Sequence, residues 1–307
     1  MATSNFIVSA LPDYVQENRE LLIKKIVLSG STIERMSKQT GIKKDAYLNF
    51  LNLSPAFQSG AGCGFTPSGD VSLTDREIET GLIKIDLEIC PENLRGKWAE
   101  YLLRTSAGEQ DLPFEAELIA ELTDFITEKM ETAVWQGDTT SADVNLKQFD
   151  GLLKILGNEV TVVTETITHG STATAAINQV WLAVPAKIIK KGISIFVSPE
   201  LFRQYISELV AANLYHYPGP QGEDVDEIVL PGGNARVVMA YGLMGTANIV
   251  ATWDRNLVYG TDLESDREVF NVTYGEREET FAVKVRWNAG VQVAFPDEVV
   301  LGTIASQ

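Results

Sequence analysis

The sequence predicts an α+β protein, and three patterns support that fold class. Apolar residues at three- and four-residue spacings mark one long amphipathic helix over residues 111–136. Residues 83–89, and the segment that begins at Thr280, alternate apolar and polar side chains with the period of a half-buried strand. Residues 158–212 alternate strand, helix, strand and helix. With 307 residues, of which 45% are hydrophobic, the chain can bury the cores of about two domains.

The composition argues against several classes of protein. The chain has 42 acidic and 25 basic residues, a formal net charge of −17. This charge argues against a protein that neutralises nucleic-acid phosphates or docks on anionic membranes. Cys63 and Cys90 are too few for a disulfide framework and are expected to be reduced thiols. The sequence has no secretory signal and no apolar run of membrane-spanning length, so we expect it to fold in a cytoplasm.

The first 60 residues are predicted to hold two helical stretches. Residues 1–12 are an apolar lead, and residues 13–28 follow a helical spacing of apolar and charged side chains. Residues 47–51 are also helix-like and stop at Ser54-Pro55. The Gly-rich residues 60–72 lack the Lys-Ser/Thr ending of a phosphate loop, so a simple connection is the favoured interpretation.

A charged hairpin is predicted next, with residues 71–81 as one arm and residues 83–89 as the other. In the second arm, one set of side chains is apolar and the alternate set is charged: Ile83, Ile85, Leu87 and Ile89 against Lys84, Asp86 and Glu88. A two-stranded hairpin of this length is marginally stable alone. We therefore expect it to lie against something else.

The central part of the chain carries the clearest helix signals. The helix over residues 111–136 has Asp111 as a candidate cap and Pro113 in its first turn. Residues 160–168 are predicted as a strand, residues 173–191 as a helix interrupted at Pro185, and residues 193–197 as a buried strand. Ser198-Pro199 is typical of a helix start, here for residues 201–212.

The C-terminal part is predicted to be β-rich. The candidate strands cover residues 237–243, 248–253, 257–261, 269–274 and 280–287. Asn288-Ala289-Gly290 is predicted to turn the chain into a further strand over residues 291–295.

No motif in the sequence predicts a catalytic, metal or cofactor site. The two histidines, His169 and His216, lie in no zinc or catalytic spacing. The acidic residues 223–227 could hold a hard cation, but they lack the ligand spacing of a calcium loop. We therefore predict no catalytic, cofactor-binding or metal residues and no enzyme, although a site of scattered carboxylates stays open as an alternative.

Several short motifs occur in an order that resembles the major capsid proteins of tailed bacteriophages, which have the HK97-like fold. The long helix ends in Trp135-Gln136-Gly137-Asp138, and Phe149-Asp150-Gly151-Leu152-Leu153 follows it. The apolar strand that ends in Ser198-Pro199, the pair Asp254-Arg255, and Arg286 four residues before Gly290 come later in the same order. The resemblance covers about residues 45–304.

This resemblance implies an HK97-like capsid fold with an arm, an extended loop called the E-loop, a peripheral domain with a spine helix, and an axial domain. The implied divisions are an N-terminal arm (1–60), the E-loop hairpin (61–96), the peripheral domain (97–155) with its spine helix (111–136), the axial domain (156–255), and C-terminal strands that complete the peripheral domain (256–307).

The resemblance further implies a structural protein that self-assembles into hexamers and pentamers, forming an icosahedral head around phage DNA. The expected partners are other copies of the chain, with a separate scaffold, portal or decoration protein as further possibilities, DNA only non-specifically, and no membrane. Assembly in the host cytoplasm and a final place in the virion are implied. The residues expected to contact neighbouring subunits are Ile83, Ile85, Leu87, Ile89, Arg76 and Lys84. The same fold occurs in encapsulin-type shells, so this alternative and a phage tail or connector protein stay open.

Overall fold

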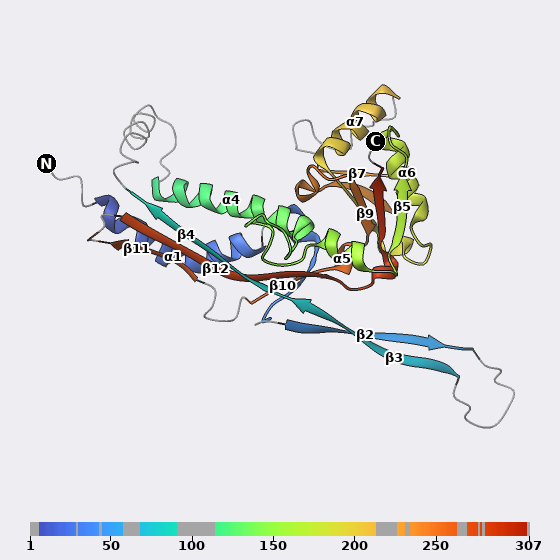
Figure 1. Ribbon diagram of the computed structural model, residues 1–307, viewed down its shortest axis with the longest axis horizontal. Coiled ribbons are helices and arrows are strands. Elements are labelled where there is room, and N and C mark those ends of the chain that lie inside the picture. Colours follow the sequence, from blue (N-terminus) through green and yellow to red (C-terminus); the bar gives the residue numbers. More distant parts are fainter. Residues whose placement is uncertain are drawn as a thin grey trace.

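Two β-sheets and a projecting hairpin make up the framework of the chain (Figure 1). The structure, a computed structural model, describes residues 6–28, 30–42, 45–57, 68–90, 114–212, 226–230, 234–262, 269–275, 277 and 280–305. The α-helices are α1 (Phe6–Leu28), α2 (Ser31–Arg35), α4 (Phe114–Gln136), α5 (Leu152–Asn158), α6 (Ala173–Ala183) and α7 (Pro199–Ala211). Short 3₁₀ turns are η1 (Ile189–Lys191), η2 (Tyr241–Leu243), η3 (Asp254–Asn256) and η4 (Pro296–Glu298).

The first sheet is organised around one long strand. Its five strands are β1 (Ser37–Gln39), β4 (Gly81–Ile89), β10 (Leu257–Thr261), β11 (Val269–Gly275) and β12 (Thr280–Val293). Strand β12 pairs antiparallel with β4, β10 and β11, and β1 pairs parallel with β10. Apolar side chains of β12 form one core with helices α1 and α4, which lie along the sheet (Figure 1).

The second sheet has six strands and a core of its own. They are β5 (Val163–Ile167), β6 (Ile193–Val197), β7 (Glu227–Val229), β8 (Ala235–Met239), β9 (Asn248–Thr252) and β13 (Val300–Ile304), in the order β5-β13-β9-β6-β8-β7. Helices α6 and α7 pack on this sheet and bury apolar residues such as Ile177, Val180 and Phe202. The strand–helix alternation predicted for residues 158–212 is confirmed here.

The third unit is a two-stranded ribbon of β2 (Asp45–Pro55) and β3 (Gly69–Glu79), which projects from the body as a long arm (Figure 1). Its strands pair antiparallel from Asp45 opposite Glu79 to Pro55 opposite Gly69.

The structure corrects the predicted hairpin. Strand β3 pairs with β2 and not with residues 83–89, which form β4 and pair with β12. The helix-like run at residues 47–51 is part of β2, so that prediction is wrong. Its apolar residues suit a strand as well as a helix, and the presence of β3 as a pairing partner decides the outcome.

The predicted turn at Asn288-Ala289-Gly290 is also wrong, because β12 runs through it without a break. Asn288 is buried, and Gly290 lies where a Cβ would come under 3.0 Å from the Glu79 carbonyl oxygen. The glycine is needed for this close approach of two backbones rather than for a change of chain direction.

Two boundaries differ from the prediction as well. Helix α1 begins at Phe6, so Pro12 lies inside it rather than ending an apolar lead. The last strand, β13, lies in the six-stranded sheet, while β10, β11 and β12 lie in the five-stranded one. The predicted unit 256–307 therefore contributes strands to both sheets.

Other expectations are confirmed closely. Strands β6 and β10 have the predicted bounds, and α4 ends at Gln136 as predicted. The Ser198 hydroxyl accepts from the Leu201 backbone N–H, so Ser198 caps α7. Asp111 and Pro113 lie outside the described residues.

Candidate functional site

The β2–β3 hairpin exposes apolar side chains on both of its strands. On β3, Val71 is 66% exposed and Leu73 is 76% exposed, and Tyr47 on β2 is also exposed. Because β2 and β3 form a sheet of only two strands, neither strand has a covering layer within the ribbon (Figure 1). A projecting apolar strip is typical of a surface that a partner covers.

The root of the hairpin, in contrast, is fixed to the body. Ile78 is fully buried with Ile42, Val258 and Ala294 in a small separate cluster. Arg76 forms an ion pair with Glu159, just beyond α5. The Gln292 side-chain amide donates to the Glu77 carbonyl at 2.6 Å. The hairpin is therefore anchored at its root by both apolar packing and polar contacts.

The six predicted contact residues fall into two environments. Ile83, Ile85 and Ile89 pack partly buried against the chain's own core, opposite Trp287, Val285 and Phe281 of β12. Leu87 is 41% exposed on the same face. Lys84 lies on the opposite, charged face and pairs with Asp86. Arg76, paired to Glu159, belongs to the hairpin root. The other five predicted contact residues belong to β4 of the five-stranded sheet. Their role between subunits stays a prediction.

The two glycine motifs found in the sequence pack against each other. Gly151 N–H donates to the Gly137 carbonyl at 2.8 Å. A Cβ on Gly137 would lie 2.6 Å from the Phe149 carbonyl oxygen, and one on Gly151 would lie 2.5 Å from the Gly137 nitrogen. Only glycine permits this crossing of the chain. The motifs therefore mark one joint, at which the chain leaves α4 and turns into α5.

Charged side chains close the same joint. Lys154 Nζ lies 2.7 Å from Asp138 Oδ1 and 2.8 Å from Asp150 Oδ1. The hydrogen bond from Lys154, with those from Thr140, lowers the pKa of Asp138 to about 2. Nearby, the Gln136 side-chain amide donates to the carbonyls of Gly242 and Met244 at 2.7 and 3.0 Å, which ties the end of α4 to the six-stranded unit.

Glu131 is a buried acid in α4 that the sequence analysis missed. Its carboxylate accepts from the Ser31 hydroxyl and from the backbone and hydroxyl of Thr32, and the Thr32 hydroxyl in turn accepts from Trp135 Nε1 at 2.9 Å. Burial raises the pKa of Glu131, and the hydrogen bonds from Thr32 oppose this. No local pattern marks it, because its partners Ser31 and Thr32 lie 100 and 99 residues away in the sequence. The contacts join the N-terminal segment to α4 rather than form a reaction site.

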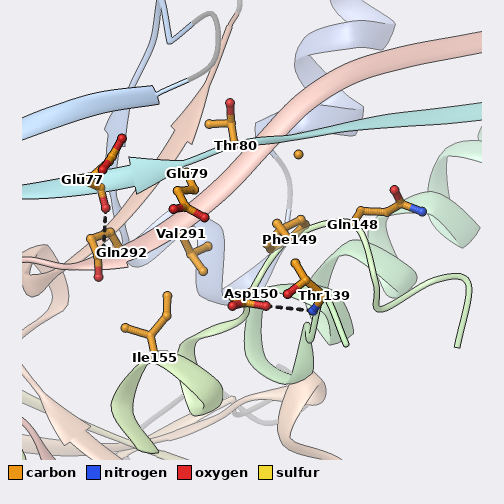
Figure 2. Close-up of a pocket in the computed structure, with 11 residues that line it drawn as sticks. Glu77, Glu79, Thr80, Thr139, Gln148, Phe149, Asp150, Ile155, Val291 and Gln292 are labelled. Atoms are coloured by element: carbon orange, nitrogen blue, oxygen red, sulfur yellow. Dashed lines mark hydrogen bonds between the residues drawn. The ribbon is translucent and has the colours of Figure 1, made fainter. Parts of the chain in front are cut away.

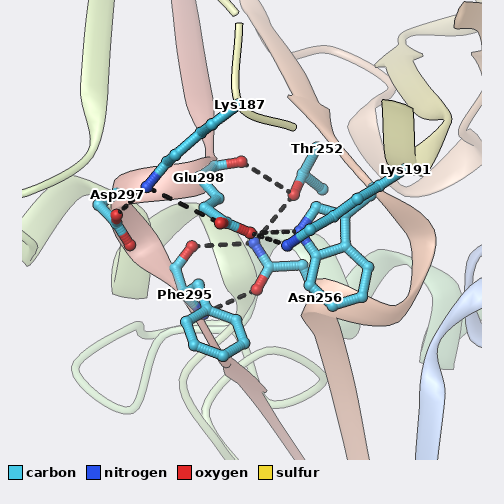
Figure 3. Close-up of polar contacts among 8 residues, drawn as sticks. Lys187, Lys191, Thr252, Asn256, Phe295, Asp297 and Glu298 are labelled. Carbon is cyan, nitrogen blue, oxygen red and sulfur yellow. Dashed lines mark hydrogen bonds and ion pairs between the residues drawn. The ribbon is translucent and has the colours of Figure 1, made fainter. Parts of the chain in front are cut away.

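A second polar cluster joins the two sheets where β9 passes into β10 and β12 into β13 (Figure 3). The Asn256 side chain donates to the Phe295 carbonyl at 2.9 Å and accepts from the Phe295 N–H at 2.7 Å. Glu298 accepts from Lys191 at 2.7 Å and from Trp253 Nε1 at 2.8 Å. Both bonds go to Glu298 Oε2, so this carboxylate oxygen has a cation and an indole N–H as partners. The cluster therefore holds the two sheets at a fixed relative position.

A cavity of about 210 Å³ lies beside the hairpin root, and Figure 2 shows the side chains that line it. Glu77, Glu79 and Asp150 are its acidic members, while Ile155 and Val291 are apolar. Within the ranges that the structure describes, no group of three or more His, Cys, Asp or Glu residues is placed to hold a metal ion. The cavity does not have the donor set of a metal centre.

The remaining candidates from the sequence do not form a site in the described part of the chain. Residues 223–225 of the acidic segment lie outside it, and Glu227 pairs with Arg35 at 2.8 Å and with Arg236 at 3.7 Å. The Gly-rich loop, Cys63 and His216 also lie outside the described residues, and His169 is exposed. No helix among the described residues is long and apolar enough to span a membrane.

Comparison with known proteins identifies the fold. No family model matches the sequence, and no curated protein matches it. Among solved structures, a chain of the satellite phage P4 procapsid that includes the size determination protein is similar over 99% of this chain and 98% of its own, with a TM-score of 0.63 and 14% identity.

Two further structures extend the comparison. The capsid of the native GTA particle matches 92% of this chain and 91% of its own, with a TM-score of 0.57 and 11% identity. A virus-like particle from Pyrococcus furiosus matches 94% and 99%, with a TM-score of 0.52 and 8% identity. The predicted α+β capsid fold is thereby confirmed for nearly the whole chain.

Proposed function

We propose that this chain is the major capsid protein of a tailed bacteriophage with the HK97-like fold. In this proposal, copies of the chain assemble into hexamers and pentamers, which close into an icosahedral head around phage DNA. The chain acts as a structural protein of the virion and performs no catalysis. Assembly takes place in the cytoplasm of the host.

The observation that carries this proposal is the β2–β3 hairpin, which has a fixed root and an exposed outer part. Its root is fixed by Ile78 and Arg76, while Val71 and Leu73 further out are exposed. An arm that is held firmly at one end and apolar at the other is suited to contact a second molecule. In a closed symmetric shell every copy both presents and receives such an arm, so each exposed strip becomes buried.

The predicted division into arm, E-loop, peripheral domain and axial domain is part of the proposal. With β2 paired to β3, the proposed E-loop covers Asp45–Glu79 instead of the predicted 61–96. The sheets support a peripheral unit built on β12 and α4, and an axial unit built on the six-stranded sheet. The partners proposed are neighbouring copies of the chain, with a scaffold, portal or decoration protein in addition. DNA would be enclosed without specific contacts, and no membrane is involved.

A second candidate is an encapsulin-type shell. The similarity to a virus-like particle from Pyrococcus furiosus, over 94% of this chain, favours retaining it. Both candidates require the chain to assemble into closed shells, and they differ in the contents of the shell.

Negative-stain electron microscopy of the purified protein tests the proposal. Closed shells are expected, and nucleic acid in shells isolated from infected cells supports a phage head over an enzyme-loaded shell. Rings or tubes would indicate a tail or connector protein, and small uniform particles at all concentrations would overturn the proposal.

Salt dependence adds a second measurement to the same experiment. Because each chain carries a net charge of −17, subunits repel one another at long range, and added salt should favour assembly. Light scattering from about 50 mM to about 500 mM NaCl, where the Debye length falls to a few ångströms, should show a rising yield of shells. A yield that falls steadily with salt would mean that attractive charge pairs dominate the contacts.

A further inference from the structure

We propose that Gly81, Gly260 and Gly290 form a socket that fixes the direction in which the β2–β3 hairpin leaves the body. These glycines are then positioning residues for the contact between subunits. The effect on the single chain stands by itself, while the effect on assembly rests on the proposed function.

The first step is the continuity of the chain between β3 and β4. Only Thr80 separates Glu79 of β3 from Gly81 of β4. Strand β4 is paired along its whole length with β12, from Gly81 opposite Ala289 to Ile89 opposite Phe281. The hairpin therefore extends a strand that the sheet already holds, and its direction depends on the few residues at the junction.

The second step is the close approach of backbones on both sides of that junction. A Cβ added at Gly81 would lie under 3.0 Å from the Gln148 carbonyl oxygen, and one at Gly290 would lie under 3.0 Å from the Glu79 carbonyl oxygen. Figure 2 shows the segment with Gln148 and Phe149 next to Thr80. Because carbonyl groups cannot move aside as side-chain ends can, a methyl group at either position must displace the hairpin or its support.

The third glycine acts through the small apolar cluster at the root. A Cβ at Gly260 would lie 2.7 Å from Ile42 Cδ1 and 3.1 Å from Ile78 Cγ2. Since Ile78 belongs to β3, Gly260 leaves the space in which the root of the hairpin packs. None of the three glycines has a positive φ, so the absence of a side chain, and not a special backbone conformation, is what the socket needs.

The fourth step is the length of the arm that the socket directs. Eleven residues of β3 at about 3.3 Å per residue give an arm of about 36 Å. A rotation of about 10° at the root would then move the tip by about 6 Å, which exceeds the separation of about 4.8 Å between paired strands. A small error at the glycines would therefore displace the tip by more than one strand spacing, and Val71, nine residues from Thr80, by about 5 Å.

Distances between spin labels test the socket without assembly. In a C63S/C90S background, nitroxides at Val71→Cys on β3 and Glu128→Cys on α4 report the hairpin direction in unassembled chains. The parent should give one narrow distance distribution, and Gly290→Ala should shift its centre by about 5 Å or broaden it about twofold, given the lever arm. Gly157→Ala is the matched control, because a Cβ there meets nothing within 4 Å.

Each outcome decides one proposal. An unchanged distribution in folded Gly290→Ala overturns the socket, whatever the chain assembles into. If Gly290→Ala does not fold, Gly260→Ala replaces it, because its new Cβ comes closer than 3.4 Å only to side-chain atoms, Ile42 Cδ1 and Ile78 Cγ2. The same glycine variants without labels should give misshapen or incomplete shells under conditions where Gly157→Ala gives normal ones. A parent protein that forms no shells overturns the proposed function and leaves the distance result intact.

Discussion

Strands β3 and β4 are nearly one continuous strand, and yet their apolar side chains have opposite surroundings. In β4, Ile83 and Ile85 pack against β12 and the core under α1 and α4. In β3, Val71 and Leu73 remain largely exposed on the hairpin. The change occurs between Leu73 and Ile78, because Ile78 at the root of the hairpin is fully buried.

The difference separates two kinds of apolar residue that a sequence presents alike. Those of β4 stabilise the single chain because their burial occurs on folding. Val71 and Leu73 of β3, unlike the buried Ile78 of the same strand, contribute almost nothing to the folded chain and become useful only when another surface covers them. The apolar residues of β4 are therefore assigned to the stability of the single chain, and Val71 and Leu73 of β3 to assembly. Each assignment can be tested separately.

The largest effect is expected from charges on the exposed half. The double variant Val71→Asp/Leu73→Asp should form no shells, because each shell contact would bury two unpaired carboxylates. The free energy of unfolding of the unassembled chain should change by no more than about 0.5 kcal/mol, as is usual for exposed positions. Electron microscopy and urea denaturation measure the two effects.

Leu182→Asp provides the control for this experiment, since Leu182 is 82% exposed and lies on α6, which packs on the six-stranded sheet and not on the hairpin. It adds a charge without touching the arm and should assemble normally. Normal shells from the double variant would contradict the assignment of Val71 and Leu73 to assembly, because the exposed strip would then have no part in it.

A smaller effect is expected in the other half. Ile85→Ala should lower the free energy of unfolding by about 2 kcal/mol, because it removes partly buried methyl groups opposite Val285. Lys84→Ala, on the charged face next to it, should change stability by less than about 0.5 kcal/mol. Shell yields from both variants also test their predicted contacts with neighbouring subunits. If Ile85→Ala lost assembly while its free energy of unfolding stayed unchanged, Ile85 would be a contact between subunits and not a core residue.

The smallest effect is expected at the joint of Gly137 and Gly151, which lies in neither β3 nor β4. The pKa of Asp138 is lowered to about 2, so its favourable contribution is complete above its ordinary value near 3.9 and is lost as the pH falls through about 2. Asp138→Asn should therefore show a shallower loss of stability between about pH 4 and pH 2. Thermal unfolding across this range checks it, and an unchanged slope would mean that Lys154 does not hold Asp138 in solution.

Local patterns were sufficient for most of the elements. The alternation of β4 and β12 placed their apolar and charged faces correctly, and the Ser198 cap marked the start of α7. The order of short motifs led to the capsid fold that the solved structures confirm. These features depend on neighbours within a few residues, which a sequence displays directly.

Pairing partners and close approaches could not be read in the same way. Residues 83–89 alternate in the same manner whether they pair with β3 or with β12, about 200 residues further on, so local periodicity could not choose between them. Asn288-Ala289-Gly290 has the composition of a turn, but its glycine makes room for the Glu79 backbone. Glu131 was missed because its partners, Ser31 and Thr32, lie 100 and 99 residues away.

The length of β12 has a mechanical consequence. A pull on the hairpin enters β4 and passes to β12 across residues 281–289, then reaches the six-stranded sheet through η4 and β13. Hydrogen bonds of an antiparallel ladder lie perpendicular to the strands, so a pull on the hairpin along the direction of β4 loads the bonds between β4 and β12 in shear. A subunit built in this way resists a pull along these strands better than a force that peels β4 away from β12.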